Sequence, residues 1–147
     1  MVQESKMACK KMISTGNLEI DRKMGGGIPF GTLMLVEGGA SSGKSSLVQQ
    51  LLWSALNTRE NVALYVTGQT VHSLLKQMAS LGLDVVDHFL MDRLRIFPVS
   101  VSRNDALDLK HLSRHMEEQV TAGVIAIDSL TTIVPWSAGE HIKDFLS

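Results

Sequence analysis

The sequence predicts an α/β domain with a mostly parallel sheet and helices on its faces. Three observations lead to this fold class. Short apolar runs alternate with helical patterns along the 147 residues, as expected when each strand is followed by a crossover helix. A glycine-rich loop stands between the first clear apolar run and a helical pattern, and a later apolar run ends in an aspartate, Asp128. Together they predict a single domain over residues 1–147.

Four apolar runs predict the strands. The first, residues 32–37, is nearly all apolar, which is typical of a strand covered on both faces. The other runs cover residues 62–67, 94–99 and 124–127. Pro98 cannot donate to a strand ladder, so the third of these runs is expected at the edge of the sheet or to end there.

Helical periodicity predicts the helices that separate these strands. The first is expected at residues 44–56, and the second at about 71–81 with Thr70 as its cap. Ser102 and Asp105 have the spacing of a capping box, which predicts a third helix from there to about residue 121. The last residues of the chain are expected to form a short helix.

The composition is that of an ordinary soluble protein, with 44% hydrophobic and 20% charged residues. The net charge of -1 argues against a strongly basic nucleic-acid binder. Cys9 is the single cysteine, so no internal disulfide can form and a reducing cytoplasm is expected. No apolar run reaches the roughly 18 residues that a spanning helix needs, so any membrane association is expected through a partner.

The glycine-rich loop, residues 38–45, matches the pattern G-x-x-x-x-G-K-[ST]. Glycines let the backbone curl so that successive N–H groups point at one anion, and the following helix adds the positive end of its dipole. A strand before the loop and a helix after it distinguish a phosphate loop from a chance match. The candidate phosphate-binding residues are Gly38, Ser41, Ser42, Gly43, Lys44, Ser45 and Ser46.

The residue types in this loop predict a nucleoside triphosphate, ATP, with Mg²⁺ as its partner. Lys44 is expected to place its charge between the β- and γ-phosphates, and the hydroxyl of Ser45 to hold Mg²⁺. Asp128 is expected to hold the same ion directly or through water, because ligands bind at the carboxyl ends of parallel strands. An aspartate that only caps the next turn is the alternative for Asp128.

Residues 13–29 carry a family resemblance. They read S-T-G-x-x-x-x-D and then G-G-G-I-P, directly before the first predicted strand. This segment resembles the RecA/KaiC-like ATPases, and within them the chain looks most like the accessory ATPases of the archaeal flagellum, the archaellum. The resemblance implies a RecA-like P-loop NTPase core and a homo-oligomer, a hexameric ring. It also implies a cytoplasmic location, at the inner face of the membrane through two partners, the archaellum motor ATPase and the membrane platform protein.

The chain departs from the family pattern at two places. RecA-like ATPases carry a catalytic glutamate at the end of the second strand, and the aligned position here is Gly68, followed by Gln69. Glycine cannot act as a base, and glutamine can orient water without taking its proton. The chain also ends soon after the Asp128 strand, so the core is expected to lack its C-terminal strand or strands. The expected function is therefore an assembly switch of the archaeal flagellar motor that binds ATP and hydrolyses it weakly or not at all.

The sequence is also compatible with other functions. One is a KaiC-like signalling ATPase or kinase. Another is a RecA-type ATPase acting on DNA, which the scarcity of basic residues after Asp128, Lys143 alone, disfavours. A structural fragment without activity is a further alternative. His111 and His115 are spaced as a metal pair on a predicted helix, but no third ligand accompanies them, which favours a solvated helix face.

Overall fold

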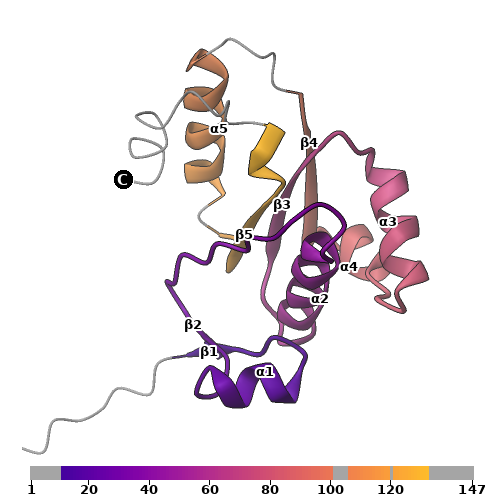
Figure 1. Ribbon diagram of the computed structural model, residues 1–147. Helices are drawn as coiled ribbons and strands as arrows, with labels where there is room; N and C mark the ends of the chain where they lie inside the picture. The colour runs from indigo at the N-terminus through magenta and orange to yellow at the C-terminus, as the bar shows by residue number, and fades with distance from the viewer. Residues whose placement is uncertain (1–10, 101–105, 120, 133–147) are drawn as a thin grey trace, which may run out of the picture.

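The computed structural model describes residues 11–100, 106–119 and 121–132 (Figure 1). Strands β1 and β2 form a short antiparallel pair, and helix α1 connects them in the chain. The main sheet and the remaining helices follow this pair in the chain. The elements are β1 (Met12–Ile13), α1 (Leu18–Lys23), β2 (Ile28–Pro29), α2 (Lys44–Asn57), β3 (Val62–Thr67), α3 (Val71–Ser80), α4 (Val86–Leu90), β4 (Leu94–Val99), α5 (Ala106–Glu118), β5 (Val124–Asp128) and the 3₁₀ turn η1 (Leu130–Thr132).

The main sheet has three parallel strands in the order β4-β3-β5. Leu64 at the centre of β3 lies opposite Ile96 of β4 and Ala126 of β5. The predicted α/β class with a parallel sheet is thus confirmed, as are the three later strands. β4 pairs with β3 alone among the described strands, so Pro98 lies on an edge strand, as its missing N–H requires.

Alternate residues of β3 face two different layers of helices. Val62, Leu64 and Val66 pack in the larger core with residues of α2, α3 and α4. Tyr65 points to the other face and packs in a smaller core with Leu112 of α5. Figure 1 shows α5 on the opposite side of the sheet from α2. β3 is buried from Val62 to Val66 because both its faces are covered, which explains its continuous apolar run.

The strand predicted at residues 32–37 is not formed. The segment joins no sheet within the described ranges, and its large side chains are exposed, at 75% for Leu33 and 65% for Leu35. An apolar run indicates a tendency to be buried, but a strand also needs a neighbour to bond with its backbone. β5 pairs with β3 along one edge and with no described strand along the other. Residues 32–37 therefore have no hydrogen-bonded neighbour among the described strands.

The helices follow the periodicity closely. α2 and α3 lie where they were predicted, and the hydroxyl of Thr70 accepts from the N–H of Ser73 at 3.2 Å as the cap of α3. The structure describes α5 from Ala106, so the capping box predicted at residues 102–105 lies outside the described residues, as does the short helix expected at the end of the chain. α1 and α4 are too short to give a clear period in the sequence.

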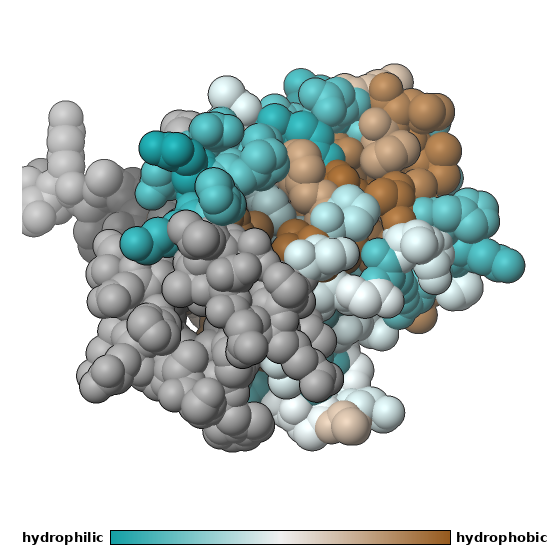
Figure 2. All heavy atoms as spheres, turned by 90° about the horizontal axis from the view of Figure 1, so that it is seen from above, coloured by the Kyte–Doolittle hydropathy of each residue, from teal (hydrophilic) through white to brown (hydrophobic). Residues whose placement is uncertain are grey.

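The surface is not uniformly polar. Figure 2 shows apolar residues gathered on one side of the view from above, bordered by hydrophilic residues. The corner between α3 and α4 exposes four large apolar side chains, Leu81, Val86, Leu90 and Met91. No helix in the described part of the chain combines the length and the apolar character needed to cross a membrane.

Candidate functional site

The glycine-rich loop leads directly into the amino-terminal end of α2. Gly43 is the N-cap of this helix and has a φ of 84°, a left-handed conformation that favours glycine. No side chain caps the helix, so its first N–H groups are left for an anion. A cavity of about 270 Å³ lies here and is lined by residues 41–46. The geometry therefore offers a site for an anion at a helix N-terminus.

Lys44 folds back over this loop. Its Nζ donates to the carbonyl oxygen of Gly38 at 2.8 Å and to that of Gly39 at 2.5 Å, and it lies 3.4 Å from the Oγ of Ser42. These contacts hold the ammonium group within the curl of the loop. A phosphate bound in the loop would meet this positive charge together with the N–H groups of α2.

Gly38 is required by a close approach within the loop. A Cβ atom added at this position would lie 2.5 Å from the Oγ of Ser42 and 3.3 Å from its Cβ. Real side chains do not approach so closely, so any other residue at position 38 would push Ser42 aside. The first glycine of the motif thus permits the tight curl that brings the loop around an anion.

Ser45 and Asp128 meet although they come from different elements. The Oγ of Ser45, in the first turn of α2, donates to Oδ1 of Asp128, at the end of β5, with a distance of 3.0 Å. A hydroxyl and a carboxylate are the hard oxygen ligands that Mg²⁺ accepts. Their proximity beside the phosphate loop fits a shared Mg²⁺, with the remaining positions left to water and phosphate oxygens. The donor set is therefore compatible with the expected cofactor.

The position expected to carry a catalytic base has no side chain that could serve. Gly68 follows β3 directly, two residues beyond Val66, the residue that lies opposite Asp128 in the ladder. The Nε2 of Gln69 donates to Oε1 of Gln77 on α3 at 2.7 Å, so its amide group is directed to that helix. The candidate role of Gln69 in orienting water stays a prediction.

The S-T-G-x-x-x-x-D segment forms a compact turn against α2. Asp21 accepts from the hydroxyl of Ser14 at 2.6 Å and from the N–H of Thr15 at 2.8 Å. These hydrogen bonds, led by that from Ser14, lower the pKa of Asp21. The Nε2 of Gln50 on α2 reaches the carbonyl oxygen of Gly16 at 3.4 Å. The turn therefore packs on the same helix whose first turn holds the phosphate loop.

Comparison with known proteins agrees with this geometry. The family described as "ATPase: KaiC" matches residues 13–145, which include the turn, the phosphate loop and Asp128. The chain belongs to the KaiC-like ATPase family. The RecA-like P-loop fold that the family resemblance implies is therefore shown, with the three-stranded parallel sheet as its described core.

Two curated relatives of this KaiC-like chain are named archaeal flagellar ATP-binding protein FlaH. The protein of Sulfolobus acidocaldarius is 29% identical over 140 residues, with 92% of this chain and 61% of the relative covered. That of Methanocaldococcus jannaschii is 33% identical over 134 residues, covering 88% of this chain and 57% of the relative. The circadian clock oscillator protein KaiC of Synechococcus elongatus is 25% identical over 137 residues, which cover 91% of this chain and 26% of that protein. The KaiC-like chain thus spans about three fifths of the length of the two flagellar relatives.

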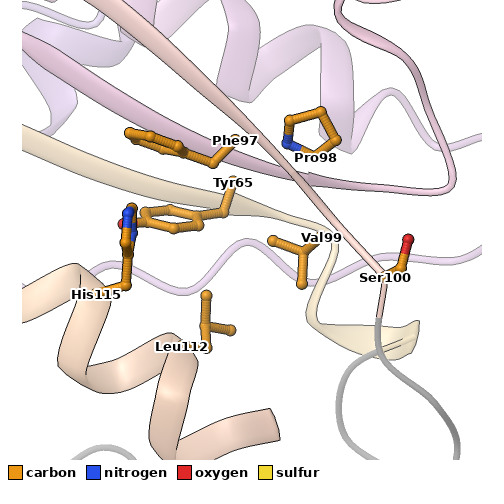
Figure 3. A pocket seen from close by; sticks show the side chains of 7 residues that line it. All are labelled: Tyr65, Phe97, Pro98, Val99, Ser100, Leu112 and His115. Carbon is orange, nitrogen blue, oxygen red and sulfur yellow. The ribbon is translucent and has the colours of Figure 1, made fainter.

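A second cavity lies away from the phosphate loop. It measures about 340 Å³ and opens between α5 and the sheet, with Tyr65, Phe97 and His115 in its wall (Figure 3). The OH of Tyr65 and Nδ1 of His115 are 2.7 Å apart, and burial raises the pKa of Tyr65. It contains no glycine-rich backbone or lysine that could hold phosphate.

The histidine pair is only partly as expected. His111 is exposed, as a solvated helix face requires, but the ring of His115 packs edge-on against Tyr65 and Phe97, so a solvated position was wrong for this residue. The helical period could not distinguish them, because it does not tell how far the sheet extends beneath α5. Within the described residues no group of three or more His, Cys, Asp or Glu side chains is placed to hold a metal ion.

Thr67 is a residue beside this site that the sequence pattern did not indicate. Thr67, the last residue of β3, is hydrogen-bonded to the backbone of Ser129, the residue after Asp128. The signal available in the sequence was its position at the end of a predicted strand beside the Asp128 strand. That signal was insufficient because the order of the strands decides which strand ends are neighbours.

Proposed function

We propose that this chain binds ATP and Mg²⁺ and hydrolyses ATP slowly or not at all, as an accessory subunit of the archaeal flagellar motor. The observation that carries the nucleotide site is the contact between Ser45 and Asp128 beside the phosphate loop. This contact supports the assignment because both oxygens are suited to Mg²⁺ and lie next to the site for the phosphates. The names of the relatives, archaeal flagellar ATP-binding proteins, support ATP as the nucleotide.

Slow turnover rests on the residues after β3. Without a carboxylate at position 68, no side chain there can take a proton from the attacking water. The amide of Gln69 already donates to Gln77, which leaves its oxygen as the group that could contact water. A protein that retains ATP in this way can act as an assembly switch, since its ATP-bound state persists long enough for a partner to recognise it.

The wider setting of this function is proposed by analogy with the relatives, which are named archaeal flagellar ATP-binding proteins. We propose that the chain acts in the cytoplasm as part of a hexameric ring. Its partners are the archaellum motor ATPase and, at the inner face of the membrane, the motor platform protein. The switch model predicts that the protein binds its motor ATPase in the presence of ATP and releases it without nucleotide.

The nucleotide site is tested by measuring the affinity for a fluorescent ATP analogue. Lys44→Ala removes the ammonium group from the loop and is expected to abolish binding. Lys76→Ala removes an exposed lysine of α3 and is the matched control, which should bind as the unmodified protein does. Equal affinities of Lys44→Ala and the unmodified protein would refute the proposed site.

Turnover and assembly need their own measurements. Phosphate release by the purified protein is expected to be close to background. Rapid phosphate release that Lys44→Ala abolishes would contradict slow turnover. It would not contradict the proposal that the protein binds ATP. Co-purification with the motor ATPase, compared with and without ATP, tests the switch, and nucleotide-independent association would contradict it.

A further inference from the structure

A second contact joins the carboxyl ends of β3 and β5, in addition to the contact between Ser45 and Asp128. The N–H of Ser129 donates to Oγ1 of Thr67 at 3.2 Å, and the same hydroxyl donates to the carbonyl oxygen of Ser129 at 3.3 Å. The last registered pair of the two strands is Val66 with Asp128. The threonine side chain thus continues the pairing of the strands by one residue.

These two bonds restrict the backbone next to Asp128. A donor and an acceptor of Ser129 are held by one side-chain oxygen, which fixes both the position and the orientation of that residue. Asp128 is its direct neighbour, and the carboxylate of Asp128 meets Ser45 at 3.0 Å. The connected series runs from β3, through the backbone of β5, to the first turn of α2.

We infer that Thr67 is a positioning residue for the Mg²⁺ site, an inference that rests on the proposed binding of ATP and Mg²⁺. Groups that orient metal ligands without touching the metal contribute to affinity, because a ligand held in place loses less freedom when the metal binds. Thr67 performs this task through the backbone of Ser129, since both of these hydrogen bonds of its hydroxyl join that residue and not the phosphate loop. Its effect is therefore expected on the metal and not on the metal-free nucleotide.

The test measures the dependence of binding on Mg²⁺ separately from the affinity for the metal-free nucleotide. Thr67→Val replaces the hydroxyl by a methyl group of similar shape, and Thr67→Ser keeps the hydroxyl. For each protein, binding of the fluorescent ATP analogue is measured in EDTA and over a titration with Mg²⁺. Thr67→Val is expected to raise the Mg²⁺ concentration at half-effect about 10-fold, at the lower end of the effect seen for such partners. Its affinity in EDTA should be unchanged, and Thr67→Ser should behave as the unmodified protein.

A purely structural role of Thr67 predicts a different pattern. It would weaken binding in EDTA and in Mg²⁺ by the same factor, and that result would overturn the inference. Thr58→Val is the matched control, because the hydroxyl of Thr58 bonds to the carbonyl oxygen of Ala55 at the other end of α2. This variant should leave the Mg²⁺ titration unchanged.

The outcomes also separate this inference from the proposed function. If the unmodified protein binds the analogue in no condition, the proposed function fails and the role of Thr67 with it. If it binds with a Mg²⁺ dependence that Thr67→Val retains in full, the inference about Thr67 alone fails. Should Thr67→Val not fold, as judged by circular dichroism, Thr67→Ser still decides, because a 10-fold change in its Mg²⁺ half-effect would overturn the inference.

Discussion

The Oγ of Ser45 lies 3.0 Å from Oδ1 of Asp128, although 83 positions separate the two residues in the chain. The first belongs to the first turn of α2, directly after the glycine-rich loop, and the second ends a strand of the sheet. This contact connects the two motifs that the sequence shows separately. The metal-dependent part of nucleotide binding is therefore expected to depend on the carboxylate of Asp128.

Asp128→Asn tests that dependence. The substitution keeps the size of the side chain and removes its charge, so Mg²⁺ loses a charged ligand or the partner of its bound water. The increase in ATP affinity caused by Mg²⁺ is expected to fall by about 10-fold or more, whereas binding in EDTA should persist. Asp92→Asn is the control, because Asp92 is exposed in the turn after α4 with a φ of 57° that asparagine tolerates. An undiminished effect of Mg²⁺ in Asp128→Asn would exclude this residue from the metal site.

Gln49→Met is expected to stabilise the protein. The side chain of Gln49 is fully buried, and neither its Nε2 nor its Oε1 has a hydrogen-bond partner among the described residues. A buried polar group without a partner costs about 1–3 kcal/mol, and methionine fills a similar volume without that cost. An increase of about 1–3 kcal/mol in the free energy of unfolding, measured with urea, is the expected result.

The neighbouring glutamine supplies the control for this prediction. Gln50 lies on the same helix, but its amide reaches the carbonyl oxygen of Gly16. Gln50→Met should therefore leave the free energy of unfolding unchanged or lower it. A loss of stability in Gln49→Met would show that its amide has a partner in solution, such as a buried water molecule.

Asp21→Asn is expected to remove a pH-dependent part of the stability. Hydrogen bonds from Ser14 and Thr15 lower the pKa of Asp21 below its ordinary 3.8. A carboxyl with a lowered pKa in the folded state stabilises the protein above the unfolded pKa, and this contribution disappears as the pH falls through the folded pKa. The Tm of Asp21→Asn should therefore be lower than that of the unmodified protein at pH 7, and the difference should shrink below about pH 4.

The comparison requires a carboxyl that lacks such partners. Asp92→Asn is suitable, since none of the described side-chain hydrogen bonds or ion pairs involves Asp92. Its Tm should follow that of the unmodified protein across the whole pH range. A difference between Asp21→Asn and the unmodified protein that stays constant from pH 7 to pH 3 would refute the role of the charge.

Leu33→Ala and Leu64→Ala test the correction to the predicted sheet. Leu33 is 75% exposed in the unpaired segment, so its truncation is expected to change the free energy of unfolding by less than about 0.5 kcal/mol. Leu64 is 1% exposed in β3, and its truncation should cost about 2–5 kcal/mol. Similar losses in urea unfolding for the two variants would mean that residues 32–37 form a buried strand in solution.

Much of the fold and of the site followed from local patterns. The apolar runs at 62–67 and 94–99 and the periodicity after Lys44 predicted elements within one or two residues of those observed. The phosphate loop was predictable because its chemistry is local: glycine, lysine and serine act within eight consecutive residues. The contacts of His115 and Thr67 were harder to predict from the sequence, since they depend on which elements pack beside these residues.

The sequence by itself determined the α/β class, the phosphate loop and the acidic end of β5, because residue type and spacing dictate backbone conformation and local chemistry. Only the tertiary structure decided that Ser45 meets Asp128, that Thr67 holds the backbone next to it, and that residues 32–37 lie unpaired. The physical reason is that a strand is completed by its neighbours. An apolar run predicts burial, but the order of the strands decides whether a hydrogen-bonding partner is present and which side chains meet at the carboxyl edge.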